Sequence, residues 1–192
     1  MNADIDISNV TLETERLILR PWRPDDLADF NEYASVDGVG QMAGWLPHKN
    51  PEESRRILDM FIAGKNEFAI EYNGKVIGSL GIEKYNETTL PEYDEKTGRE
   101  IGFVLSKDYW GMGLMPEAVN RVIEYIFEDL KLDFIVCGHY TENDQSRRVQ
   151  EKCGFEHLKL IKTETRYVGV KDLWVSVLER GNYEGLHGTT AH

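Results

Sequence analysis

The chain has 192 residues, of which 41% are hydrophobic, and a formal net charge of −12 from 22 Lys and Arg against 34 Asp and Glu. This length and apolar content predict one folded domain and exclude a disordered chain. The acidic charge argues against general nucleic-acid binding, which depends on neutralising phosphates. It would attract cationic substrates, and a surface charge that only keeps the protein in solution is the alternative interpretation.

No apolar run approaches the roughly 20 residues of a membrane span. The first residues lack the basic and apolar regions of a signal peptide, so we expect a cytoplasmic protein with no membrane partner. The two cysteines, Cys137 and Cys153, have no metal-binding spacing and form no disulfide framework. We therefore expect no bound metal and two buried, inert thiols.

The first half of the chain predicts a strand, two helices and a hairpin. Polar and apolar residues alternate in the strand, and each helix opens on a proline followed by acidic residues. The turn Asn73-Gly74 favours a tight hairpin between two apolar runs. The predicted elements are a strand over 14–20, helices beginning at Pro24 and over 51–64, and hairpin strands over 68–72 and 75–82.

The second half alternates strands with helices. An apolar strand precedes a glycine turn at 109–114, and an amphipathic helix follows the turn. We expect a single domain over residues 1–181 and a flexible tail over 182–192. The predicted elements are strands over 100–105 and 134–138, helices from Met115 to Phe127 and over 144–152, and strands over 157–167 and 172–178 that meet at Gly169.

The glycine turn between strand and helix is a candidate phosphate site. Gly111 and Gly113 allow the backbone N–H groups to converge at the positive end of the helix dipole. A dinucleotide fingerprint would require glycine where Pro116 stands, and a nucleotide P-loop would end in Gly-Lys-Ser/Thr, which is absent from the sequence. Both common nucleotide motifs are therefore poor fits.

Four motifs occur in order along the chain, at 12–21, at 101–105 with 109–118, at 143–146 and at 151–155. In this order they resemble the GNAT superfamily of N-acetyltransferases, and more narrowly its RimJ/RimL branch of ribosomal-protein N-terminal acetyltransferases. The resemblance covers about residues 10–181 and implies an α/β (α+β) fold. That fold has a mixed, mostly antiparallel sheet of about seven strands with a V-shaped split, flanked by about four helices.

The resemblance implies acetyl-CoA as co-substrate, bound in the split between the strands at 100–105 and 134–140. The backbone of the first strand would pair with the pantetheine arm, and the amides of the glycine turn would hold the pyrophosphate. Pro116 has no N–H and cannot contribute to this phosphate site. Asn143 would bond the pantetheine arm, and Ser146 would lie near the sulfur. The implied contacts are Phe103, Val104, Leu105, Gly111, Met112, Gly113, Leu114, Met115, Asn143 and Ser146.

Acetyl transfer needs a neutral amine, a donor to the oxyanion and a proton for the departing thiolate. The resemblance implies the Val104 N–H as oxyanion donor and Ser146 as proton donor; a serine that bonds its own backbone is the alternative. Glu100 is the first choice as base, with Glu83 and His139 as the other options. At pH 7 deprotonation costs roughly 1.4 kcal/mol for an α-amine and more than about 4 kcal/mol for lysine.

We expect an acetyl-CoA-dependent N-acetyltransferase that acts on a primary amine such as a protein N-terminus. A small-molecule amine (an amino acid, a polyamine or an antibiotic) is the alternative acceptor, and a catalytically silent CoA-binding module is the alternative class. The resemblance is compatible with a homodimer. Arg147 and Arg148 could meet a CoA phosphate, and the acidic segment 86–98 could contact a cationic acceptor, although solvated surface is the simpler interpretation of both.

Overall fold

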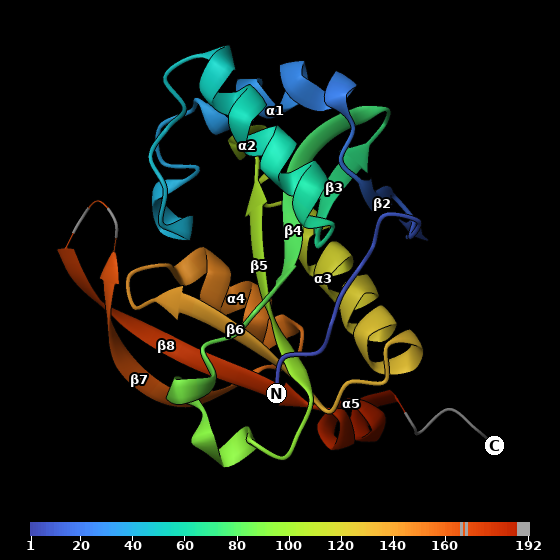
Figure 1. Cartoon of the computed structure of the whole chain (residues 1–192), viewed down its shortest axis with the longest axis vertical. Helices are drawn as coiled ribbons and strands as arrows, with labels where there is room; N and C mark the ends of the chain where they lie inside the picture. The colour runs from blue at the N-terminus through green and yellow to red at the C-terminus, as the bar shows by residue number, and fades with distance from the viewer. Residues whose placement is uncertain (166, 168, 188–192) are drawn as a thin grey trace.

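The computed structural model of the chain describes residues 1–165, 167 and 169–187 (Figure 1). The helices are α1 (Leu27–Ala34), α2 (Pro51–Gly64), α3 (Leu114–Glu124), α4 (Asp144–Lys152) and α5 (Arg180–His187). The strands are β1 (Leu12–Glu13), β2 (Leu17–Pro21), β3 (Glu67–Tyr72), β4 (Lys75–Glu83), β5 (Gly98–Leu105), β6 (Phe134–Tyr140), β7 (Glu156–Thr165) and β8 (Gly169–Glu179).

Within the described residues, eight strands form one sheet in the order β1-β2-β3-β4-β5-β6-β8-β7. Neighbouring strands are antiparallel except β5 and β6, which run parallel. The predicted mixed, mostly antiparallel sheet is therefore confirmed, with one strand and one helix more than expected.

The ends of α2 and the turn of the β3–β4 hairpin lie where residues close together in the sequence predict them. Asn50 caps α2 by accepting a hydrogen bond from the Glu53 N–H at 2.9 Å, and α2 ends where Lys65 turns left-handed at φ 56°. Asn73 and Gly74 have φ values of 50° and 78°, as the tight turn between β3 and β4 requires. These features depend on neighbours in sequence, which is why they could be predicted.

Helices cover both faces of the sheet. Helices α1 and α2 pack on one face through Phe30, Tyr33 and Leu58, which meet Ala69 on β3. Helix α3 lies on the opposite face of β2–β5 (Figure 1). The apolar stripe predicted for α3 and the turn that follows is buried, as expected: Met115, Ala118, Val119, Val122, Ile123, Ile126 and Phe127.

The structure differs from the predicted elements at both ends of the chain. The run at 14–20 is not one strand. The Thr14 N–H donates to the Leu17 carbonyl and the Leu17 N–H donates to Thr14 Oγ1, and this turn separates β1 from β2. Residues 182–187, expected in the tail, continue the helix α5, and Tyr183 packs against Phe127 with ring centroids 5.0 Å apart. Residues 188–192 of that tail, and residues 166 and 168 beside the predicted Gly169 turn, lie outside the described residues.

None of the helices in the described part of the chain has the length and apolarity that a membrane crossing requires.

Candidate active site

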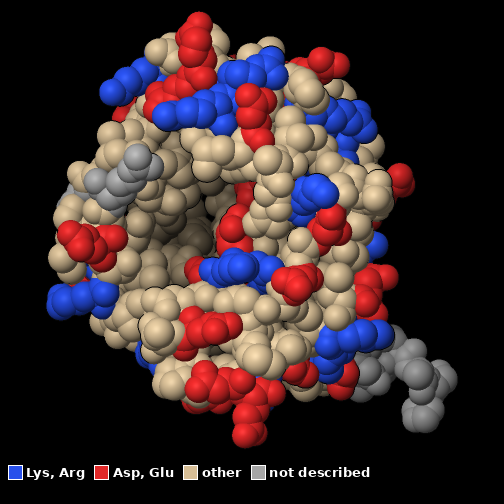
Figure 2. Space-filling model, viewed as in Figure 1, with Lys and Arg blue, Asp and Glu red and all other residues tan. Residues whose placement is uncertain are grey.

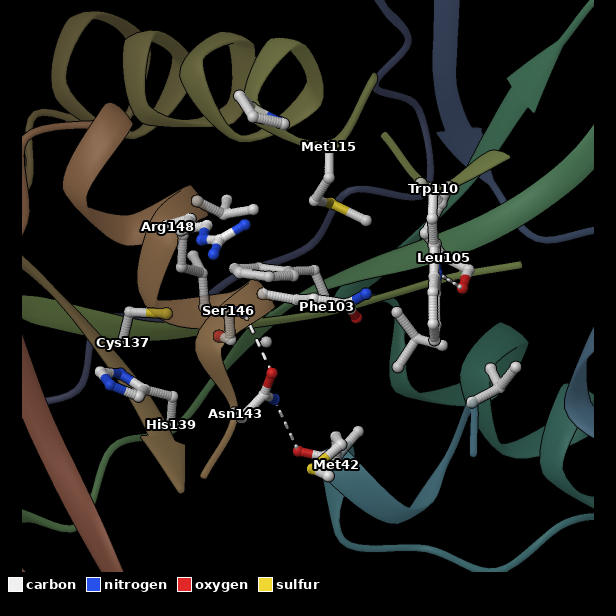
Figure 3. Close-up of a pocket in the computed structure, with 18 of the residues that line it drawn as sticks. Met42, Phe103, Leu105, Trp110, Met115, Cys137, His139, Asn143, Ser146 and Arg148 are labelled. Carbon is white, nitrogen blue, oxygen red and sulfur yellow. Dashed lines mark hydrogen bonds between the residues drawn. The ribbon is translucent and has the colours of Figure 1, made fainter. Parts of the chain in front are cut away.

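The strands β5 and β6 separate part-way along their length. Their parallel pairing covers only Gly98 to Glu100 against Phe134 to Val136, and the rest of both strands diverges. A cavity of about 500 Å³ lies in this split, walled by β5, β6, the starts of α3 and α4, and the loop at 38–43 (Figure 3). The predicted V-shaped split is therefore present at the predicted strands.

The antiparallel pairing of β5 with β4 decides which backbone groups face the split. The Ser106 N–H donates to the Ile77 carbonyl at 2.8 Å, and hydrogen-bonded pairs alternate along an antiparallel ladder. Val104, two residues away and opposite Ser79, therefore turns its N–H and C=O toward β4. Phe103 and Leu105 turn theirs toward the open side, where the Leu105 carbonyl accepts a hydrogen bond from Trp110 Nε1 at 2.8 Å.

The prediction that the Val104 N–H contacts the oxyanion or the co-substrate is therefore wrong. Its side chain does line the cavity, but its amide is turned to the neighbouring strand. Phe103 and Leu105 keep the predicted place on the open edge. An unpaired strand edge of this kind can receive an extended ligand as an added strand.

The glycine turn lies at the entrance of the cavity, before the first turn of α3. Gly111 and Gly113 have φ values of 79° and 77°, which only glycine adopts without strain, and Gly113 is the residue that caps α3. The first N–H groups of a helix have no partner within it, so Leu114 and Met115 present free amides there. This arrangement fits an anionic phosphate group.

Among the predicted contacts, Met112 is placed differently from the rest. Its side chain is exposed and stands outside the cavity lining, while its carbonyl accepts a hydrogen bond from Arg16 Nη1 at 2.9 Å. Arg16 also forms an ion pair with Glu117 on α3 at 2.6 Å. Arg16 therefore holds the glycine turn against the helix start. The sequence analysis missed this role, although Arg16 lies in the first of the four motifs.

Asn143 and Ser146 lie together at the start of α4, on the β6 side of the cavity (Figure 3). The Asn143 side chain caps α4 by accepting from the Ser146 N–H at 3.1 Å, and its Nδ2 donates to the Met42 carbonyl at 3.4 Å. The Ser146 hydroxyl accepts a hydrogen bond from Gln150 Nε2 at 3.1 Å and does not bond its own backbone in the described structure. Its proton is thus left for another acceptor.

The two arginines of α4 differ in their surroundings. Arg147 forms ion pairs with Asp144 and Glu151 at 3.0 and 2.7 Å. Arg148 lines the cavity and turns its guanidinium toward Met115 (Figure 3). Arg148 is therefore the arginine placed to meet an anionic group in the cavity.

Glu100 occupies the point where the split begins. A Cβ atom at Gly138 of β6 would lie 3.7 Å from Glu100 Oε1, so the carboxylate reaches across toward β6. Burial, and then the nearby charge of Glu83, raises the pKa of Glu100 to about 7. A carboxylate with this pKa is suited to accept a proton near neutral pH.

A second acidic group adjoins Glu100: it joins Glu83, one of the alternative bases, to Glu67, which no motif in the sequence indicated. Glu67 on β3 and Glu83 on β4 both lie over Gly81, where a Cβ atom would come within 2.2 Å of Glu67 Oε2 and 2.8 Å of Glu83 Oε1. Burial and the Glu83 carboxylate raise the pKa of Glu67 to about 8, so Glu67 keeps its proton near neutral pH. Figure 2 shows acidic side chains on the wall of the hollow beside these strands.

The raised pKa of Glu67 predicts how stability depends on pH. Because the folded-state pKa of Glu67 is raised, its contribution to stability is full at low pH and is lost as pH rises toward about 8. Glu67→Gln mimics the protonated acid, so its melting temperature should exceed that of the wild type at pH 9 and match it near pH 5. Thermal melts at the two pH values test this, with Glu52→Gln on the exposed side of α2 as control. An equal shift at both pH values would contradict it.

Two other predicted groups already have partners in the fold. His139, an alternative base, lines the cavity, but it is buried beneath α4 and its Nδ1 bonds Gln150 Oε1 at 3.1 Å. The acidic segment 86–98 packs through Leu90 and Tyr93 on the part of the sheet formed by β6 and β8, and Glu92 pairs with Lys159 at 2.7 Å. No residue of that segment lines the cavity in the described structure.

Comparison with known proteins agrees with this geometry. A family model described as an acetyltransferase (GNAT) domain matches residues 16–156. The uncharacterized N-acetyltransferase p20 of Bacillus licheniformis is 28% identical over 184 residues, which covers 91% of this chain and 99% of that protein.

Two solved structures share the fold. A spermidine N-acetyltransferase from Vibrio cholerae, in complex with CoA and spermine, has a TM-score of 0.71 at 21% identity and covers 88% of this chain and 99% of its own. A ribosomal-protein-S5-alanine acetyltransferase from Vibrio fischeri has a TM-score of 0.67 at 19% identity and covers 90% of this chain and 97% of its own.

Members of the matched family use acetyl-CoA as acetyl donor, and the free strand edge at Phe103 and the free amides at the start of α3 suit such a donor. The match spans well over half of the chain and includes both strands of the split, the glycine turn and α4. The chain therefore belongs to the acetyltransferase (GNAT) family and is an N-acetyltransferase.

Proposed function

We propose that the enzyme transfers the acetyl group of acetyl-CoA to the α-amine of a protein N-terminus, by direct attack in a ternary complex. The main support for this acceptor class is the pKa of Glu100. At about 7, it lies close to the pKa of an α-amine, which is roughly 8. A lysine side chain has a pKa near 10.4, about 3 units above that of Glu100, so proton transfer from lysine to this base would be much less favourable. The RimJ/RimL motifs and the ribosomal-protein enzyme among the fold relatives favour the same acceptor.

The co-substrate is assigned to the split. The pantetheine arm would pair with the open edge of β5 at Phe103 and Leu105, and the amide of Asn143 would exchange its Met42 partner for the arm. The pyrophosphate would bind amides of the glycine turn and of the first turn of α3, contributed by Gly111, Gly113, Leu114 and Met115. The exposed Arg148 would approach a phosphate oxygen.

Each chemical task then has a group on the cavity wall. Glu100 accepts the proton of the amine as its nitrogen attacks the acetyl carbon, and the Phe103 N–H donates to the oxygen that becomes negative. When the carbon–sulfur bond breaks, the Ser146 hydroxyl donates its proton to the CoA thiolate. The products are the N-acetylated amine and CoA. Solvent then takes the proton from Glu100 and returns one to the serine.

A small cationic amine is the second acceptor class. The carboxylate of Glu83 beside Glu100 favours it, because a negative charge near the cavity attracts a second positive charge. The spermidine N-acetyltransferase among the fold relatives acts on such an amine. A single domain, a cytoplasmic location and a homodimer belong to the same proposal. The proposed domain extends past residue 181, because α5 continues to His187.

The acceptor class can be measured by thiol release. Calorimetry should first show binding of acetyl-CoA but not of NADH or ATP, and a protein that binds none of them would contradict the co-substrate assignment. Turnover with peptides of free N-terminus is then expected to exceed turnover with spermidine and with the same peptides blocked at the N-terminus. Faster turnover with spermidine would assign the small-amine acceptor instead.

A further inference from the structure

Gln150 is a buried polar residue on a helix that otherwise exposes its polar side chains. It is 1% exposed and is the buried residue of α4. An apolar side chain at this position would pack against the sheet without needing partners, whereas a buried amide must be hydrogen-bonded throughout. The arrangement of its partners therefore indicates what the amide does.

All polar atoms of the Gln150 side chain are engaged. Nε2 donates to the Gly138 carbonyl at 3.2 Å and to Ser146 Oγ at 3.1 Å, and Oε1 faces His139 Nδ1 at 3.1 Å. The Gly138 carbonyl can only accept, so it determines which end of the amide carries the nitrogen. His139 Nδ1 must then be the protonated nitrogen, and burial lowers the pKa of this imidazole, which keeps the ring neutral.

This orientation determines the direction of the Ser146 proton. A serine in the first turn of a helix commonly gives its proton to a backbone carbonyl of the preceding turn. Here the hydroxyl oxygen already accepts the Gln150 N–H, and within the described residues the hydroxyl donates to no protein group. Since an amide nitrogen cannot accept, the proton is directed away from Gln150, on the side where Ser146 lines the cavity.

We infer that Gln150 is a positioning residue that holds the Ser146 hydroxyl with its proton toward the cavity, with Gly138 and His139 fixing the amide. The inference rests on the proposed role of Ser146 as proton donor to the departing thiolate. It adds a residue that never touches the substrate but sets the direction of the proton transfer.

The test compares Gln150→Glu with Ser146→Ala in steady-state kinetics. A carboxylate at 150 accepts the serine proton and turns it away from the cavity, so kcat should fall about as far as in Ser146→Ala, on the order of 100-fold. The KM for acetyl-CoA should change less than about threefold in both variants. In the double variant the losses should not add, because one interaction has been removed twice.

Two further variants separate orientation from charge and from folding. Asn120→Asp places the same charge on an exposed position of α3 outside the cavity lining, and kcat should stay within about twofold of wild type. Gln150→Met keeps the volume without the hydrogen bonds, and kcat should fall about tenfold while a melting curve reports that the protein is folded.

The possible results distinguish the two proposals. A Ser146→Ala variant at the wild-type rate would remove the proton-donor role of Ser146 and this inference with it. A slow Ser146→Ala variant beside a folded Gln150→Glu variant at the wild-type rate would overturn the role of Gln150 alone. Additive losses in the double variant would also overturn it, because Gln150 would then act independently of the serine.

Discussion

Gly111→Glu is expected to weaken acetyl-CoA binding by at least about 100-fold. Gly111 lines the cavity at the glycine turn, and a side chain there would meet no protein atom within 4 Å. A glutamate would therefore project into space assigned to the pyrophosphate and oppose its negative charge, at a cost of several kcal/mol. Calorimetric titration with acetyl-CoA measures the loss.

The hairpin glycine Gly74 provides a matched control. It has nearly the same left-handed conformation, φ 78° against 79°, and equally open surroundings, but it lies between β3 and β4 and does not line the cavity. Gly74→Glu introduces the same strain and charge, and it should bind acetyl-CoA like the wild type. Equal affinity of Gly111→Glu and the wild type would dismiss the glycine turn as the phosphate site.

Glu100→Gln is expected to lower kcat/KM by about 100-fold or more at pH 8, because the amine loses its proton acceptor. In the wild type, ionisation of Glu100 near pH 7 and of an α-amine near pH 8 both raise the rate as pH increases. Below pH 7 a plot of log(kcat/KM) against pH should therefore have a slope of about 2 in the wild type. In Glu100→Gln only the amine titrates, and the slope should fall to about 1.

The kinetic control is Glu92→Gln, which removes a carboxylate outside the cavity where it pairs with Lys159. It should leave both the rate and the slope unchanged. A Glu100→Gln enzyme that is slower but keeps the slope of 2 would transfer the role of base to another group, with Glu83 and Glu67 as the nearest carboxyls.

Much of the site could be predicted from the sequence because its parts are local. A strand, a glycine turn and a helix are consecutive in the chain, so Gly111 and Gly113 indicated the helix start that the structure shows at Leu114. Asn143 and Ser146 lie within one helical turn, and a capping asparagine with a nearby hydroxyl follows from that spacing. The position of Glu100, at the start of the predicted strand over 100–105, could also be predicted from the sequence.

The tertiary structure alone decided the features that depend on partners far away in sequence. Whether Val104 or Phe103 faces the split depends on the register of β5 against β4, since N–H groups alternate between the two edges of a strand. The pairing of Glu67 with Glu83 requires β3 and β4 to lie side by side over Gly81, and Arg16 reaches Met112 across 96 residues. Gln150 is one polar residue among many on α4 until folding buries it against His139 and Ser146. Sequence spacing determines which groups share a turn, whereas strand register and burial determine which atoms finally meet.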